Sequence, residues 1–385
     1  MTQGTHRQAD VALSNSDAAE EITIKACPQA GIDVSRASIL ADATEQRQVI
    51  PATQHVLMLR AFGSSDGFAV VEQPMPEPGP GELLVKVLAA SVQFTDILLR
   101  KGRYPDLKAK PPLVLGYDVV GEVVKVGPGV NGVSVGQRVA DLTVTGSYAQ
   151  YRTLEADRVT TVDPALDPAE VTSLVLSWMT AYQLLHRDAG IQNGQNLLVI
   201  GAAGAVGQAL VALGVLAGCK VWGAAHPQHA NSVRALGAIH IDSDQVDFEH
   251  VLPAGFDVVF DGIGQQGFSR AWRGVGPKGH LSAYGVSAGI QANAPLALMG
   301  VWLAKLWWWN TFSAARTTSF FSITALRKKH PDWFMADLSL LIGMLAQGTI
   351  KPRVAERIAL DAVADAHTRL ERGGLEGKIV LIPNH

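Results

Sequence analysis

The 385-residue chain contains only two cysteines, Cys27 and Cys219, and charged residues make up only 17% of it. Two cysteines are too few for a disulfide framework or for a zinc lobe built from several thiolates. The net charge is −3, from 32 basic and 35 acidic residues, so the chain lacks a basic surplus. We therefore expect neither a cysteine-bound structural metal nor a nucleic-acid partner.

Residues 1–54 lack the basic region and apolar run of a secretory signal. They are polar and acidic with scattered alanines, which predicts a flexible N-terminal extension and a cytoplasmic protein. Internal repeats and low-complexity tracts are also missing. The hydrophobic fraction of 48% and the length of the chain allow a large core and two domains.

The most informative stretch runs from Asn196 to Ala225. An apolar strand-like run leads into a glycine turn, then into an apolar helix-like segment and a second strand-like run, which predicts one βαβ unit. Gly204 and Gly207 match the dinucleotide fingerprint, whereas Ala202 replaces its first glycine. Gly204 would let the backbone approach a pyrophosphate, and the helix N-terminus would offer unpaired N–H groups to it. An ordinary strand-to-helix turn is the alternative, which the βαβ context disfavours.

The end of the second strand decides between NAD and NADP. An acidic residue there would bind the ribose 2′-hydroxyl of NAD, but residues 222–226 contain none. His226, His229 and Arg234 follow instead, and basic groups favour a 2′-phosphate. We therefore expect NADPH, with NADH as the second choice; for His229 the alternative is an ordinary solvated helix residue.

Two different patterns flank this unit. From His55 onward, short strands alternate with Gly- and Pro-rich turns, which is typical of a small irregular β-barrel. Strands are expected at 56–61, 68–73, 82–91, 119–126, 135–139 and 146–152. Residues 168–186 are predicted to be helical. Beyond the glycine turn, a helix at 231–236, a strand at 256–261, a helix at 266–272 and a strand at 280–284 continue the alternation. This order predicts an α/β fold with a doubly wound parallel sheet and a ligand at the carboxyl ends of its strands.

Residues 295–321 are rich in tryptophan and phenylalanine, and 296–312 are almost entirely apolar. The run is too short and too interrupted to predict a membrane span. A substrate lid or a subunit contact is the favoured interpretation; core packing and membrane contact through 296–312 stay open. Amphipathic helices at 332–346 and 361–372, the second with Asp361 as its N-cap, and a strand at 378–382 complete the chain.

Three segments together resemble the medium-chain dehydrogenase/reductase superfamily, in particular its zinc-independent quinone oxidoreductase-like branch. They are Pro-Gly-Pro-Gly-Glu-Leu-Leu-Val-Lys-Val at 78–87, Gly-Tyr-Asp-Val-Val-Gly-Glu-Val at 116–123, and Gly-Gly-Leu-Glu-Gly-Lys-Ile-Val-Leu at 373–381. The resemblance implies a GroES-like β-barrel catalytic domain at 55–172 and 318–385. It also implies a Rossmann dinucleotide-binding domain at 173–317.

The resemblance also bears on metal chemistry. Zinc-dependent relatives carry a cysteine where this chain has Gln93, and a His-Glu pair where it has Tyr117 and Asp118. Glutamine and tyrosine are not ordinary zinc ligands. Hydride delivery to a quinone or to an activated double bond is then the natural chemistry.

For the reaction itself, the resemblance implicates Tyr104 as a proton donor, with Gln93 and Asp96 as further catalytic groups. The alternative for Tyr104 is a partly buried tyrosine with a satisfied hydroxyl. The alternative for Asp96 is a carboxylate that orients its own loop through local hydrogen bonds.

The remaining expected contacts fall into two groups. Substrate contacts are expected from Phe94, Tyr117 and Trp307. Cofactor contacts are expected from Thr180, Gly201, Ala203, Gly204, Ala205, Val206, Gly207, His226, His229, Arg234, Gly262, Ile263, Tyr284, Gly285 and Lys378.

The leading functional hypothesis is a zinc-independent NAD(P)H-dependent reductase of quinones or α,β-unsaturated carbonyl compounds. One alternative is an enoyl-thioester reductase of the polyketide or fatty-acid type. Another is a membrane-associated or interaction protein that binds NADPH and turns over little substrate. The resemblance also implies a homodimer.

Overall fold

The structure, a computed structural model, describes residues 50–104, 109–244, 247–287, 296–313 and 315–385. Most of the expected N-terminal extension therefore lies outside the described residues. Ile50–His385 form one unit by their internal contacts.

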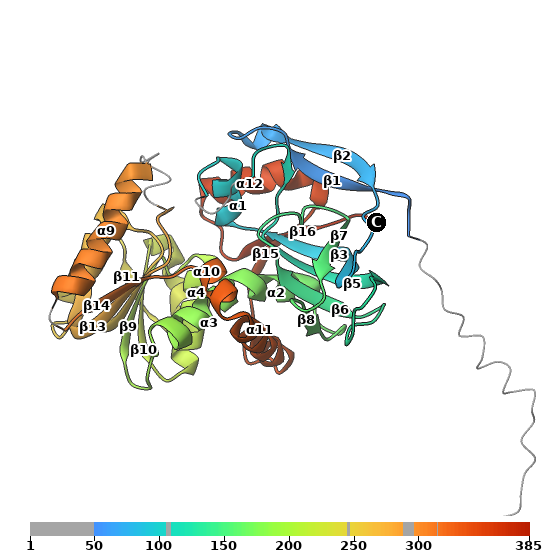
Figure 1. The fold of residues 1–385 in the computed structure, drawn as a ribbon. Helices are drawn as coiled ribbons and strands as arrows, with labels where there is room; N and C mark the ends of the chain where they lie inside the picture. Colours follow the sequence, from blue (N-terminus) through green and yellow to red (C-terminus); the bar gives the residue numbers. More distant parts are fainter. Residues whose placement is uncertain (1–49, 105–108, 245–246, 288–295, 314) are drawn as a thin grey trace, which may run out of the picture. The chain divides into compact units, whose positions relative to one another are not determined.

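The first part of this unit contains two sheets whose strands are mostly antiparallel (Figure 1). One sheet has the order β2-β1-β4, and the other has the order β15-β16-β3-β5-β6-β8, with β7 also paired to β3. β15 runs parallel to β16, and the other pairs are antiparallel. The bounds are β1 (Thr53–Leu59), β2 (Phe68–Pro74), β3 (Glu82–Val92), β4 (Leu113–Val114), β5 (Asp118–Val126), β6 (Arg138–Leu142), β7 (Tyr151–Glu155), β8 (Thr160–Val162), β15 (Val354–Ala359) and β16 (Lys378–Ile382).

Helices join and cover these strands. They are η2 (Ser65–Gly67), α1 (Phe94–Arg100), α2 (Pro168–Ser173), α10 (Ile323–Lys329), α11 (Pro331–Ala346), η7 (Leu360–Ala362) and α12 (Val363–Arg372). The predicted helix at 168–186 is confirmed: α2 continues through η3 (Leu174–Trp178), α3 (Met179–Gln183) and η4 (Leu184–Asp188), where η3 and η4 are π-helical turns. Asp167 caps its start by accepting a hydrogen bond from the Ala169 amide (3.0 Å).

The second part is a parallel sheet with the order β11-β10-β9-β12-β13-β14. The central pairings confirm the predicted βαβ unit, since β9 and β10 are parallel and α4 connects them. The strands are β9 (Asn196–Ile200), β10 (Lys220–Ala225), β11 (Ile239–Asp242), β12 (Phe256–Asp261), β13 (Val275–Ala283) and β14 (Thr317–Phe320). The helices are α4 (Ala205–Leu216), η5 (Pro227–His229), α5 (Ala230–Ala235), α6 (Phe248–Val251), η6 (Gln265–Phe268), α7 (Ser269–Gly274) and α9 (Leu296–Phe312).

The sheet is buried on both faces because successive side chains along each strand enter different cores. Leu197 and Val199 pack in one cluster, together with residues of α3 and α4. Leu198 and Ile200 pack in another, together with Phe268 and Leu306. Continuous apolar runs such as 197–200 are what a parallel strand covered on both sides requires.

The tryptophan-rich segment forms α9, which contacts β14 at the edge of the sheet (Figure 1). Trp302, Leu306 and Trp309 share one side of the helix and pack toward the sheet; the Trp309 ring stacks on Trp272 at 4.9 Å. β14 pairs with β13, so Thr317–Phe320 stay with this sheet and the predicted domain boundary after residue 317 passes through β14. None of the helices within the described residues has both the length and the apolar composition to cross a bilayer.

Several local predictions were wrong. Residues 94–100 form α1, between strands, where no helix was expected. Asp361 is not the N-cap of the last helix: it lies in η7, and Ala362 precedes α12. The strands predicted at 135–139 and 146–152 lie further along the chain, at Arg138–Leu142 and Tyr151–Glu155.

Candidate functional site

The glycine turn after β9 has the shape that close helix packing requires. Gly201 has a φ of +82°, a region that favours glycine. A Cβ on Gly207 would lie 2.1 Å from the Gly201 carbonyl oxygen, so only glycine fits there. A Cβ on Gly204 would lie 3.4 Å from the same oxygen, an ordinary contact. Gly207 is therefore required by the fold, whereas nothing within the turn requires glycine at 204.

Gly204 is exposed and immediately precedes α4, which has no side-chain cap at its start. The amides of the first turn are thus not used by a capping side chain, and a helix N-terminus of this kind attracts anions. Ala203, Ala205 and Val206 are half-buried around the same turn. The geometry fits the pyrophosphate of a dinucleotide.

The carboxyl ends of neighbouring strands meet at this turn. Ile200 of β9 is paired with Asp261 of β12, which is paired in turn with Ala283 of β13. This register brings Ile263 against Gly201, since a Cβ on Gly201 would lie 3.0 Å from the Ile263 Cδ1. Gly262, Tyr284 and Gly285 also meet, because a Cβ on Gly262 would contact the Tyr284 ring and one on Gly285 would contact the Gly262 carbonyl. The structure thus groups these predicted cofactor residues.

Asp261 holds the turn after β12. Its Oδ1 accepts hydrogen bonds from the amides of Ile263 (2.8 Å) and Gly264 (2.9 Å). Burial raises its pKa to about 6, although both amide hydrogen bonds oppose the shift.

The basic residues after β10 are arranged differently from a simple phosphate site. His229 donates or accepts through both ring nitrogens: Nδ1 lies 3.0 Å from Glu376 Oε1, and Nε2 lies 3.0 Å from Gln228 Nε2. Arg353 also pairs with Glu376 (2.5 Å). His226 and Arg234 are exposed. His229 would have to exchange its Glu376 contact to bind a phosphate. His226 also has partners, because its Nδ1 accepts from the Gln228 amide (3.3 Å) and its Nε2 lies 4.0 Å from Asp244 Oδ2. Arg234 is therefore the better placed cation.

A second group of polar side chains lies at the start of α1, where the chain leaves β3. The carboxylate of Asp118 accepts hydrogen bonds from the Ser91 amide (2.7 Å), the Ser91 hydroxyl (2.6 Å) and Gln93 Nε2 (2.6 Å). Lys378, brought here by the pairing of β16 with β3, donates to Gln93 Oε1. All four residues are buried. The Gln93 amide is therefore held at both ends by protein groups.

Burial controls the charges of this group. It raises the pKa of Asp118, against the opposing effect of the Lys378 ammonium and the Ser91 hydrogen bonds. It lowers the pKa of Lys378 to about 8, against the effects of Asp118 and Asp96. Both shifts favour the uncharged forms, as expected when two partners leave water together.

This donor set does not suit zinc. Zinc in proteins is bound mainly by cysteine, histidine and available carboxylates. The residues here are glutamine, serine and one aspartate whose oxygens accept N–H and O–H groups, with a lysine beside them. Among the residues the structure describes, no cluster of His, Cys, Asp and Glu could hold a metal ion.

Asp96 connects α1 to the neighbouring loops. Its Oδ2 accepts from the Gln93 amide (2.9 Å), its Oδ1 accepts from the Gly116 amide (3.2 Å), and Tyr148 also bonds to it. It is completely buried, and burial raises its pKa to about 7. These contacts support the loop-orienting alternative for Asp96 and make it a positioning residue.

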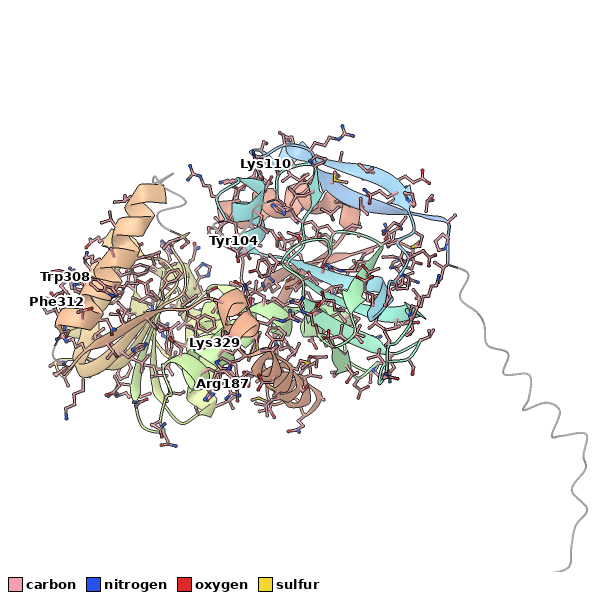
Figure 2. All side chains as sticks on the ribbon, viewed as in Figure 1. Tyr104, Lys110, Arg187, Trp308, Phe312 and Lys329 are labelled. Carbon is pink, nitrogen blue, oxygen red and sulfur yellow. The ribbon has the colours of Figure 1, made fainter. Side chains whose placement is uncertain are left out.

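Two tyrosines lie beside this group. The hydroxyl oxygens of Tyr104 and Tyr117 are 2.6 Å apart, and their rings meet edge to face with centroids 6.0 Å apart. Tyr117 is buried, whereas Tyr104 is half-buried and follows α1 (Figure 2). Phe94, the first residue of α1, is also half-buried. The structure thus brings together two of the residues implicated in proton donation and substrate contact.

Two other predicted residues lie on helices α3 and α9. Thr180 is buried in α3, which packs on α4. Trp307 is 65% exposed on α9, on a surface with Trp308 and Phe312, which Figure 2 shows on the side of α9 away from the sheet. The geometry therefore gives Trp307 a surface position, not one beside the tyrosines.

The sequence prediction missed the buried partners Ser91 and Tyr148 and the acceptor role of Asp118. It also missed Glu376, the partly exposed partner of His229. The Gln93-x-x-Asp96 spacing carried a usable signal, since an acidic residue at the third helical position often reaches back to the helix start. No local signal pointed to the other partners.

Two family models match segments of the chain. Residues 79–164 match the alcohol dehydrogenase GroES-like domain, and residues 236–381 match the zinc-binding dehydrogenase family. A 2-haloacrylate reductase from Burkholderia sp is 33% identical over 239 residues, covering 59% of this chain and 72% of that protein. The chain belongs to the medium-chain dehydrogenase/reductase superfamily. This confirms the predicted superfamily and its quinone oxidoreductase-like branch.

Further members of the superfamily are similar over most of their length. The human synaptic vesicle membrane protein VAT-1 homolog is 29% identical over 344 residues, covering 85% of this chain and 86% of that protein. A quinone oxidoreductase of Pseudomonas syringae pv. Tomato DC3000 has a TM-score of 0.74 at 26% identity, covering 86% of this chain and all of that one. A mycobacterial protein solved with NADPH has a TM-score of 0.73 at 26% identity, with the same coverage. The predicted fold class, a Rossmann sheet with a GroES-like β-barrel domain, is confirmed.

Proposed function

We propose that this chain is an NADPH-dependent reductase of quinones or α,β-unsaturated carbonyl compounds that needs no zinc. The observation that carries the proposal is the paired hydroxyls of Tyr104 and Tyr117, 2.6 Å apart, beside a buried polar group without ordinary zinc donors. A reductase of this kind needs a hydride source and a proton donor, and the chain offers residues for both.

The residues around the glycine turn fit the dinucleotide. Gly204 and the uncapped start of α4 would accept the pyrophosphate, and His226 and Arg234 would face the 2′-phosphate. The similarity to a structure solved with NADPH supports this choice. When bound, NADPH supplies the hydride to the β-carbon of the substrate.

The two tyrosines would then supply the proton. As the hydride adds, the electron pair of the double bond moves toward the carbonyl oxygen, giving an enolate. Tyr104 donates its hydroxyl proton to that enolate and is left as a tyrosinate. A hydrogen bond from Tyr117 to the Tyr104 oxygen stabilises the tyrosinate until water restores its proton. Asp96, Asp118, Gln93 and Lys378 fix the start of α1 and so the position of Tyr104.

Replacing Tyr104 by phenylalanine tests the proposal, with Tyr151→Phe on β7 as the matched control. We expect Tyr104→Phe to lower kcat for a simple enone by about 10²- to 10⁴-fold, the usual contribution of a general acid. Quinone reduction should fall less, because water can protonate quinone oxygens. An unchanged enone rate in Tyr104→Phe would show that Tyr104 is not the donor.

A further inference from the structure

An open pocket of about 540 Å³ lies where the end of α1 meets the turn before η2 and one side of α12. α1 and α12 lie side by side (Figure 1). The pocket is lined by Arg100, Lys101, Arg103 and Glu371, with hydroxyls from Ser65 and Thr368. It is separate from both the glycine turn and the buried group around Gln93.

The pocket is positively charged. Glu371 is shared, because its Oε2 lies 2.5 Å from Arg100 Nη2 and its Oε1 lies 2.5 Å from Lys101 Nζ. Arg103 forms no ion pair with any residue in the described part of the chain. Three cations against one carboxylate leave an excess of two positive charges in the lining.

Stabilisation of the helix end does not account for these cations. Basic side chains near a helix C-terminus often satisfy its last carbonyl groups. Here those carbonyls already accept backbone amides: Ile97 from Lys101, Leu98 from Arg103, Leu99 from Gly102, and Arg100 from Gly63. The helix end therefore needs neither Lys101 nor Arg103. Lys101 is held by Glu371, whereas the side chain of Arg103 is available to a ligand.

Arg100 supports the same conclusion. It is almost fully buried, and its Nη1 donates to the Gly63 carbonyl (2.5 Å). Its Nε is buried and has no hydrogen-bond partner among the residues described. Beside it, the hydroxyls of Ser65 and Thr368 are 3.0 Å apart. The Thr368 hydroxyl also donates to the Ala364 carbonyl (2.9 Å), so these hydroxyls are already engaged with protein groups. The guanidinium groups are what would recognise phosphate here.

The pocket is near the proposed reaction site. α1 starts next to Gln93 and ends at Arg100, a rise of about 10 Å at 1.5 Å per residue, and Tyr104 follows four residues later. We propose that this pocket binds the phosphate groups of a coenzyme A thioester whose enoyl end is reduced beside Tyr104. The proposal rests on the reductase function proposed above and selects a phosphorylated acyl thioester among its substrates.

The test compares two thioesters with the same acyl group. Crotonyl-coenzyme A carries phosphates, and crotonyl-N-acetylcysteamine does not. We expect Arg103→Ala and Lys101→Ala to raise KM for the first by at least about tenfold, the loss typical of a charged hydrogen bond. KM for the second should not change, and Lys125→Ala, an exposed cation on β5, should change neither. Equal effects on both thioesters, or none, would overturn the proposal.

A binding measurement separates the two proposals. Calorimetric titration of the NADP⁺-saturated protein with crotonyl-coenzyme A should show binding that Arg103→Ala weakens and that added inorganic phosphate competes for. Absent or Arg103-independent binding overturns the pocket proposal even if a simple enone is reduced. Binding that Arg103→Ala weakens, without oxidation of NADPH on any substrate, would support the pocket proposal and contradict the reductase function.

Discussion

The hydroxyl oxygen of Tyr117 lies 2.6 Å from that of Tyr104, so one hydrogen bond joins the two side chains. Tyr117 is buried and directly precedes β5, while Tyr104 is half-buried after α1. A buried hydroxyl aimed at a more accessible one can support the loss of a proton from it.

Tyr117→Phe should therefore act through Tyr104. We expect kcat for a simple enone to fall by about tenfold, close to the cost of one hydrogen bond. In a double-mutant cycle, Tyr104→Phe/Tyr117→Phe should be no slower than Tyr104→Phe alone, because the contact is already lost. Additive losses would mean that Tyr117 acts on the substrate independently.

The glycine turn allows a sharp comparison. Gly204→Ala adds a methyl group that the protein tolerates, with its nearest neighbour at 3.4 Å, whereas the same change at Gly207 places it 2.1 Å from a carbonyl oxygen. Gly204→Ala should keep the melting temperature and weaken NADPH binding at least about tenfold, since backbone approach to a phosphate is blocked. Gly207→Ala should lower the free energy of unfolding by about 1–3 kcal/mol. Unchanged NADPH affinity in Gly204→Ala would place the pyrophosphate elsewhere.

The raised pKa of Asp96 makes the stability of the folded protein depend on pH. Its pKa in the folded protein is about 7, against an ordinary value of 3.8. Between these values the folded protein keeps a proton that the unfolded chain releases, so this group lowers the free energy of unfolding as pH rises from about 4 to about 7. The slope is up to about 1.4 kcal/mol per pH unit, and the loss is complete above about pH 7.

Urea unfolding across this pH range measures the effect. Asp96→Asn should be less stable than the parent protein at low pH, because an amide NH₂ would face a backbone amide. Its free energy of unfolding should no longer fall with pH through the titration of residue 96. Asp365→Asn, an exposed position on α12, should keep the slope of the parent protein. Identical slopes in the parent protein and Asp96→Asn would show that Asp96 titrates normally.

The exposed side of α9 predicts a subunit contact. Val301, Trp307, Trp308 and Phe312 are each more than half exposed. An apolar surface of this kind usually marks an interface. We expect a homodimer in sedimentation analysis that becomes monomeric in Trp307→Ser/Trp308→Ser, but not in Leu340→Ser on α11. A monomeric parent protein that sediments with liposomes through these tryptophans would favour membrane contact instead.

Local patterns in the sequence predicted the elements that depend on local forces. The βαβ unit, the strand at Phe256–Asp261 and the strand at Lys378–Ile382 follow from runs of apolar residues bounded by glycines. The glycine turn was predicted for the same reason, since its geometry depends on residues a few positions apart.

Long-range pairing could not be predicted in this way. Lys378 reaches Gln93 across 285 positions because β16 pairs with β3, and His229 meets Glu376 across 147 positions. The spacing of apolar residues along one segment does not reveal which strands will pair, or which buried charged groups will then meet. The helix α1 was missed because its seven residues are too short to show a helical period.

The most direct test of the central claim is a fluorescence titration with NADPH and NADH, followed in the same cuvette by a simple enone, a quinone and crotonyl-coenzyme A. We expect tighter binding of NADPH than of NADH, and oxidation of bound NADPH by at least one of these acceptors. Failure to bind either nucleotide would contradict the assignment of the glycine turn at residues 201–207, and with it the proposed reductase.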